Sequence, residues 1–219
     1  MTYVEPFAGS FALIRYLYKL NNNLQFHIND NDTVLFNIYT KIEEYQNEVN
    51  SFLQYFRQIE KYNRINKLKE YTFINNEFKD TIIKTYVVRG YIIKVSKKDV
   101  TDQSTIDILK KSRVTCLDYI EVLKEYKDNN KAFIFLDPPY LFCNNSNYQK
   151  QHGERTDMDN SDMIINILEF MKTCKCRCLL IVNDLKIIRM LYGDMIKDEY
   201  DVVYQISKRK SKHLIITNY

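Results

Sequence analysis

Residues 132–140 read Ala-Phe-Ile-Phe-Leu-Asp-Pro-Pro-Tyr, and this stretch decides how the rest of the chain is interpreted. The run 133–136 is apolar and rich in strand-forming residues, and it ends in Asp-Pro-Pro-Tyr. Two consecutive prolines lack amide donors and have a fixed φ, so a strand is expected to stop there. Open α/β sheets bind ligands outside the carboxyl ends of their strands. The stretch therefore predicts a ligand site, with a simple strand-ending turn as the alternative.

The side chains of this tetrapeptide suit a flat ring that carries an amino group. The Asp137 carboxylate and the Pro138 carbonyl are hydrogen-bond acceptors, and both can hold the hydrogens of an exocyclic amine. Tyr140 offers an aromatic face, and stacking on a nucleic-acid base is worth roughly 1–3 kcal/mol. A nucleobase is thus a ligand of the right chemistry.

Composition sets broad limits on the protein class. The 219 residues are 45% hydrophobic and 14% aromatic, which predicts one folded domain, or one domain with an insertion. The net charge of +4 permits a nucleic-acid partner without requiring one. Asn, Ile, Lys and Tyr are abundant, which is typical of proteins from A·T-rich genomes. We expect a viral or bacterial source.

Two features bear on the compartment. No apolar run approaches the ~20 residues of a membrane span, and no signal peptide opens the chain, so we expect no membrane partner. The five cysteines are an odd number, which suits reduced thiols in the cytoplasm or another reducing compartment.

Three of the cysteines alternate at Cys174, Cys176 and Cys178, whereas zinc sites usually space paired cysteines two to four apart and add further ligands. His27 and the other histidines do not cluster with them in sequence, so we predict no metal site.

The amino-terminal segment has the pattern of a nucleotide-binding unit. Residues 2–4 predict a strand, 5–10 a turn containing Gly9, and 11–20 a helix, which is the order that sets backbone amides against a nucleotide. A second strand at 24–28 ends in Asn-Asp-Asn-Asp. Asp30 stands where such folds place the acid that accepts from ribose hydroxyls, and Asp32 is the candidate cap of a helix over 34–44.

The remaining chain divides into two parts. Residues 45–112 interleave basic, aromatic and amide side chains, which favours either a surface that tracks nucleic acid or a solvated helical face. Regular patterning resumes with strands over 114–117 and 178–182, helices over 119–126, 162–171 and 187–192, and a final strand pair over 201–207 and 214–219. Alternating strands and helices predict an α/β fold with a mostly parallel, helix-covered sheet and an antiparallel carboxyl-terminal edge.

Taken in order, these segments resemble the Dam-type adenine-specific DNA methyltransferases. Residues 4–9 (Val-Glu-Pro-Phe-Ala-Gly) resemble the family's cofactor turn, and Asn29-Asp30 its ribose-acid segment. Residues 117–119 (Leu-Asp-Tyr) resemble the segment whose acid contacts the cofactor adenine. Residues 137–140 match the catalytic tetrapeptide, and 182–184 and 214–219 resemble the late strands.

The resemblance implies a Rossmann-like, S-adenosylmethionine-dependent enzyme that acts on adenine flipped out of DNA. Asp137, the Pro138 carbonyl and Tyr140 would bind and orient the target amino group. The cofactor would be held by residues at the strand ends, namely Glu5, Phe7, Gly9, Asp30 and Asp118. Residues 1–44 and 113–219 would form the catalytic domain, with 45–112 as an inserted target-recognition region.

Two departures from the family pattern leave alternatives open. Phe11 stands where the family has a small residue or glycine, so its ring either crowds the methionine end of the cofactor or faces the core. The family's Gly- and Lys-containing segment before the turn has no counterpart in this sequence. Either the enzyme is minimal, or a partner subunit supplies the missing parts, or the fold is kept as a DNA-binding or structural subunit without activity.

Overall fold

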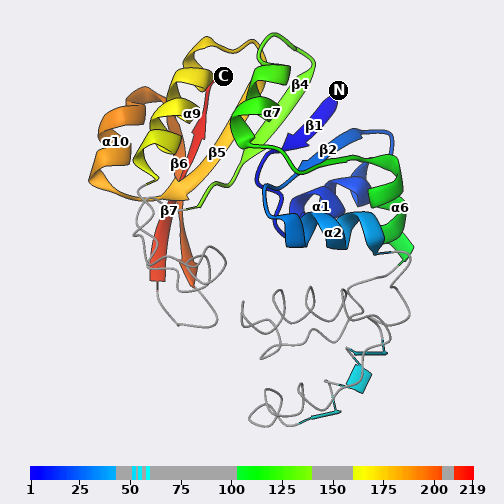
Figure 1. The fold of residues 1–219 in the computed structure, drawn as a ribbon. Helices are drawn as coiled ribbons and strands as arrows, with labels where there is room; N and C mark the ends of the chain where they lie inside the picture. Colours follow the sequence, from blue (N-terminus) through cyan, green and yellow to red (C-terminus); the bar gives the residue numbers. More distant parts are fainter. Residues whose placement is uncertain (43–50, 53, 56–57, 60–102, 140–159, 204–209) are drawn as a thin grey trace.

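The computed structural model describes residues 1–42, 51–52, 54–55, 58–59, 103–139, 160–203 and 210–219 (Figure 1). Its centre is a seven-stranded sheet in the order β3-β2-β1-β4-β5-β7-β6. The strands are β1 (Thr2–Glu5), β2 (Gln25–Asn29), β3 (Arg113–Thr115), β4 (Ala132–Leu136), β5 (Arg177–Asn183), β6 (Ile196–Val203) and β7 (Lys210–Thr217). The pairs from β3 to β5 are parallel, and β7 is antiparallel to both β5 and β6.

Helices cover both faces of this sheet. On one face lie α1 (Ala12–Leu20), α2 (Thr33–Lys41) and α6 (Gln103–Lys111), and on the other lie α7 (Tyr119–Tyr126), α9 (Ser161–Thr173) and α10 (Lys186–Tyr192). A short 3₁₀ turn, η3 (Gly193–Met195), leads into β6. The three layers are visible in Figure 1.

Alternation along the strands explains the two helical layers. Tyr3 packs with Phe26 and the α1 side, whereas the next residue, Val4, packs with Ile134 and the α7 side. Successive strand residues point to opposite faces, so a sheet that is apolar on both faces needs a helix layer on each. This arrangement confirms the predicted α/β, Rossmann-like sheet with an antiparallel edge.

The order of the strands reverses between β1 and β4. From β1 the chain builds outward through β2 and β3, and later returns to place β4 on the other side of β1. Such a switch point opens a crevice at the carboxyl ends of the two central strands. Glu5 ends β1 and Asp137 follows β4, so both acids lie at this switch point.

The edge strands differ from the sequence-based bounds. We predicted strands over 201–207 and 214–219. In the structure β6 already begins at Ile196, and β7 begins at Lys210, before the predicted start of the last strand. The reason is that β6 is almost wholly exposed, so it shows no buried alternation from which its start could be read. Residues 204–209 lie outside the described part.

Most of the predicted insertion also lies outside the described residues. Its last part forms α6, whose Ile106, Ile108 and Leu109 are buried in the same core cluster as Phe26 and Ile28. This helix therefore belongs to the helical layer over β2. In the part of the chain that is described, no helix combines the length and apolar character needed to cross a membrane.

Candidate active site

The acids predicted from sequence gather at the carboxyl edge of the sheet. Strands β2, β1 and β4 are adjacent and parallel, so their ends bring Asp30, Glu5 and Asp137 to one edge. The charge of Asp137 is close enough to act on Glu5 and to raise its pKa. The sheet thus joins the predicted cofactor turn to the predicted catalytic tetrapeptide.

Asp30 fixes the glycine turn. Its Oδ2 accepts a hydrogen bond from the Gly9 amide at 2.9 Å, and its Oδ1 accepts from the Asp32 amide at 3.0 Å. Gly9 has a φ of +52°, a left-handed conformation that glycine adopts without a Cβ clash. A Cβ built on Gly9 would meet no atom within 4 Å, so the turn borders open space. Asp32 caps α2 as predicted, accepting from the Leu35 amide at 3.3 Å.

Glu5 is a buried acid, with only 3% of its surface exposed. Its pKa is raised to about 8, mainly by burial and with a smaller contribution from the charge of Asp137, while hydrogen bonds from the Tyr3 hydroxyl and the Ile14 amide oppose the shift. The Tyr3 hydroxyl donates to Glu5 Oε1 at 3.0 Å. In the protein alone, Glu5 is therefore mostly protonated at neutral pH.

Asp137 has a different environment from Glu5. It is exposed at the end of β4, yet the surrounding protein desolvates its carboxyl group enough to raise its pKa to about 6. At neutral pH it is mostly ionised and accepts hydrogen bonds. Pro138 is buried behind it, and Tyr140 lies outside the described residues. Two carboxyls with separated pKa values, one neutral and one charged, are a common arrangement in active sites.

Asp118 and Phe7 complete the set of predicted cofactor residues. Asp118 caps α7, because its Oδ1 accepts from the Ile120 amide at 2.8 Å, and its side chain is exposed at the helix start. The half-buried Phe7 ring packs against Tyr119, with centroids 5.3 Å apart. Both residues lie on segments that follow strand ends, next to the edge that carries Glu5.

A buried amide that the sequence reasoning did not single out ties two of these segments together. Asn29 Nδ2 donates to the carbonyls of Pro6 and Leu117, each at 3.0 Å. Its Oδ1 accepts from the Leu117 amide at 2.9 Å and from the Thr115 hydroxyl at 2.7 Å. Asn29 is fully buried, so one side chain holds the cofactor turn and the Asp118 segment in register.

The same network continues inward through a histidine. Because the Thr115 hydroxyl donates to Asn29, it accepts from His27 Nε2 at 2.8 Å, and Nδ1 then accepts from the Tyr126 hydroxyl at 3.0 Å. Burial lowers the pKa of His27 to about 4, so the ring is neutral at physiological pH. The sequence signal for this network was the alternation of His27 and Asn29 with the apolar Phe26 and Ile28 in β2.

Phe11 faces the core and does not crowd the site. Its side chain is 7% exposed and packs edge-on against Tyr39, with centroids 5.4 Å apart. The Tyr39 hydroxyl in turn donates to the Gly9 carbonyl. Phe11 has a φ of +39°, in the region that favours glycine, which explains why a glycine suits this position in the family. Of the two alternatives drawn from the sequence, the core-facing one is correct.

This strand order, with its antiparallel seventh strand and an acid-lined edge at the switch point, is consistent with a Rossmann-like methyltransferase fold. A model of the family described as D12 class N6 adenine-specific DNA methyltransferase matches residues 93–211, more than half of the chain, and the chain belongs to this family. The matched range includes Asp118 and the tetrapeptide at 137–140 but not the turn around Gly9.

A curated relative agrees with this assignment. The Type II methyltransferase M.CviBI of Paramecium bursaria Chlorella virus NC1A is 26% identical over 132 residues, which cover 56% of this chain and 47% of the relative. The match therefore spans about half the length of that relative.

Proposed function

We propose that this protein transfers a methyl group from S-adenosylmethionine to the 6-amino group of adenine in DNA. The observation that carries the proposal is the meeting of the glycine turn, Asp30 and Asp137 at one edge of the sheet. Family membership supplies the reaction class, and the residues at this edge supply the roles.

The residues around the turn fit the proposed cofactor. Open space borders Gly9, and Asp30 accepts a hydrogen bond from its amide; Glu5 at the end of β1 and Asp118 at the start of α7 offer further carboxyl groups. S-adenosylmethionine, when bound, supplies an electrophilic methyl group on a cationic sulfur. Asp30 and Asp118 would accept hydrogen bonds from the nucleoside, and the Phe7 ring would contact its base. Glu5 would face the cationic end, where positive charge favours its ionised form.

Asp137 and Pro138 would bind and orient the nucleophile, which is the adenine amino group. The ionised Asp137 carboxylate and the Pro138 carbonyl would accept the two hydrogens of the adenine amino group, which turns the nitrogen lone pair toward the methyl group. As the N–C bond formed, the bond between the methyl group and sulfur would break, and the positive charge would move from sulfur to the amino nitrogen, which would then lose a proton. A carboxylate with a raised pKa is a stronger acceptor for that proton than an ordinary one.

Base flipping is part of this proposal. The amino group of a paired adenine is engaged in the duplex, so the base would leave the stack to reach Asp137, and Tyr140 would stack on it. Positioning of donor and acceptor in line would supply much of the rate enhancement. The part of residues 45–112 that precedes α6 would contact DNA around the flipped base.

The test is transfer of a labelled methyl group to adenine-containing DNA, with DNA lacking adenine as the blank. Asp137→Asn is expected to lower the rate at least 100-fold, because it removes one acceptor and its charge. Asp201→Asn, an exposed acid on edge strand β6, is the matched control and should keep wild-type activity. Equal rates for Asp137→Asn and Asp201→Asn would reject the assigned role.

The alternative of an inactive DNA-binding or structural subunit predicts a different result. One of its two supports was a Phe11 ring blocking the cofactor site, and that ring is in the core. Calorimetry of the full chain with S-adenosylmethionine separates the two functions. Binding heat at micromolar cofactor supports the enzyme, whereas no binding and no transfer would overturn it.

A further inference from the structure

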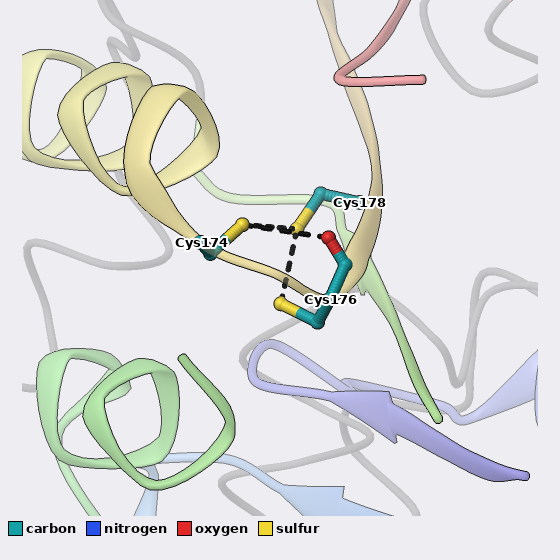
Figure 2. A group of neighbouring side chains, drawn as sticks. All are labelled: Cys174, Cys176 and Cys178. Carbon is teal, nitrogen blue, oxygen red and sulfur yellow. Dashed lines mark hydrogen bonds between the residues drawn. The ribbon is translucent and has the colours of Figure 1, made fainter. Parts of the chain in front are cut away.

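Three cysteines meet at the opposite edge of the sheet from the candidate active site (Figure 2). Cys174 follows the end of α9, Cys176 lies in the short turn after it, and Cys178 is the second residue of β5. Because β5 is parallel to β4, its beginning lies at the amino edge, away from Asp137. The cluster is therefore separate from the methyl-transfer site.

The sulfur atoms have the spacing of a thiolate metal site. Cys178 Sγ is 3.7 Å from both Cys174 Sγ and Cys176 Sγ, and all three lie within 4.8 Å of one another. With Zn–S bonds of about 2.3 Å, two sulfur ligands at tetrahedral angles stand about 3.8 Å apart. The Cys174 and Cys176 sulfurs are also within 4.8 Å of each other, so small side-chain movements would let all three bind one ion.

One side chain holds all three cysteines in place. Asn218 Nδ2 donates to Cys174 Sγ at 3.3 Å and to the Cys176 carbonyl at 3.0 Å, and its Oδ1 accepts from the Cys178 amide at 2.8 Å. Such outer hydrogen bonds orient metal ligands and stabilise the negative charge on sulfur. One of these bonds reaches a sulfur directly, and the other two fix the backbone that carries the remaining cysteines.

Burial limits access to the cluster. Lys175 and Arg177 alternate with the cysteines in sequence and are both exposed, but Lys175 pairs with Asp128 at 3.0 Å and Arg177 lies over the Tyr219 ring, so neither is a partner of the sulfurs. Cys176 and Cys178 are buried and Cys174 is half-buried, so within the described part of the chain solvent reaches the cluster from the Cys174 side.

We propose that Cys174, Cys176 and Cys178 bind one Zn²⁺ ion, with a solvent molecule as fourth ligand on the Cys174 side. Binding displaces three thiol protons and forms three Zn–S bonds with no change of oxidation state. The ion would tie the end of α9 to the start of β5 and, through Asn218, to the last residues of the sequence. The ion would lie at the amino edge of the sheet, apart from the proposed methyl-transfer site.

The test measures zinc on the full chain, purified with a reductant and dialysed against a weak chelator. Wild type is expected to retain about one zinc per chain, and Co²⁺ in its place should show thiolate charge-transfer and tetrahedral d–d bands. Cys174→Ser should lose both signals, while Cys116→Ser, a half-buried cysteine outside the cluster, should keep them. Asn218→Ala should weaken zinc binding roughly 10- to 100-fold.

A second measurement needs no variant. If zinc is bound to the thiols, it slows their reaction with an aromatic disulfide reagent, and a strong chelator restores the rate in the wild type. Zinc content below one tenth per chain, equal content in Cys174→Ser and wild type, or thiol reactivity unaffected by chelator would each overturn the proposal. A mass lower by two hydrogens under the same reducing conditions would instead identify a disulfide, and would overturn it as well.

Discussion

Glu5 makes stability depend on pH in a direction that can be tested by replacing it with glutamine. The residue is 3% exposed, and its pKa is about 8 instead of the ordinary 4.5. Below pH 4.5 the carboxyl is protonated in both the folded and the unfolded chain. Between pH 4.5 and about 8 it is ionised only when unfolded, so folding takes up a proton and the free energy of unfolding falls as pH rises.

The size of the effect follows from the two pKa values. Each pH unit in the window from 4.5 to about 8 is worth about 1.4 kcal/mol, so the loss is at most about 5 kcal/mol. Local relaxation and water entry lower this limit, and we expect 2–5 kcal/mol. Glutamine has nearly the same shape, stays neutral at every pH and can still accept from the Tyr3 hydroxyl. Glu5→Gln should therefore match wild type at pH 5 and exceed it at pH 9.

The assay is denaturant unfolding of wild type and Glu5→Gln at unit steps from pH 5 to pH 9. The quantity to compare is the difference in free energy of unfolding between the two proteins, because His27 adds its own pH dependence to both. With its pKa lowered to about 4, His27 takes up a proton on unfolding and removes stability from both as pH falls below 6.5. A difference of 2 kcal/mol would also appear as roughly 4–8 °C in Tm.

Glu121→Gln, on the exposed face of α7, is the matched control and should track wild type at every pH. The reasoning is refuted if the difference between wild type and Glu5→Gln changes by less than about 0.5 kcal/mol between pH 5 and pH 9. Such a result would mean that water or a charge partner solvates the Glu5 carboxylate in the folded protein.

Three further predictions concern the same edge of the sheet. Phe11→Ala should cost about 3–5 kcal/mol of stability, and Phe11→Gly about 1 kcal/mol less because glycine adopts a φ of +39° without strain, an order that thermal unfolding can check. Asn29→Asp should cost on the order of 3 kcal/mol in denaturant unfolding, since it removes the donor to the Pro6 and Leu117 carbonyls and sets a charge against them. The methyl-transfer kcat/KM should rise with pH through about 6 as Asp137 ionises, and a flat profile from pH 5 to pH 8 would exclude Asp137 as the titrating group.

Local signals in the sequence predicted much of the sheet. The helix at Tyr119–Tyr126 was predicted to the residue, because Asp118 is a good cap and the apolar positions recur at helical spacing. The end of β4 was equally clear, since two prolines cannot continue a strand. The position of Asp30 after the second strand singled it out from the pattern, and the family resemblance added Glu5; the cofactor roles of both remain proposals.

Long-range contacts account for what could not be predicted. The Asn29 network joins residues separated by 88 and 99 positions in sequence, and no local pattern encodes such a meeting. Cys174 and Cys178 are another case. Alternate cysteines on one strand would share a face, but Cys174 precedes β5 and reaches its neighbours only because the chain turns between α9 and the strand.

The positions where local preference and the fold disagree lie together at the carboxyl edge. Phe11 is a bulky residue in a left-handed conformation, and Glu5 is an acid buried where its ionised form is disfavoured. Strain of this kind persists when the surroundings hold it in place, and it concentrates at functional sites. Here Asp30 accepts from the Gly9 amide and Tyr39 donates to the Gly9 carbonyl. These hydrogen bonds offset the strain of the turn and hold it in a conformation that is open to a ligand. Glu5 lowers the stability of the free protein, but a cationic ligand would favour its ionised form. Glu5→Gln keeps the packing and removes the charge, so it tests which of the two the residue serves.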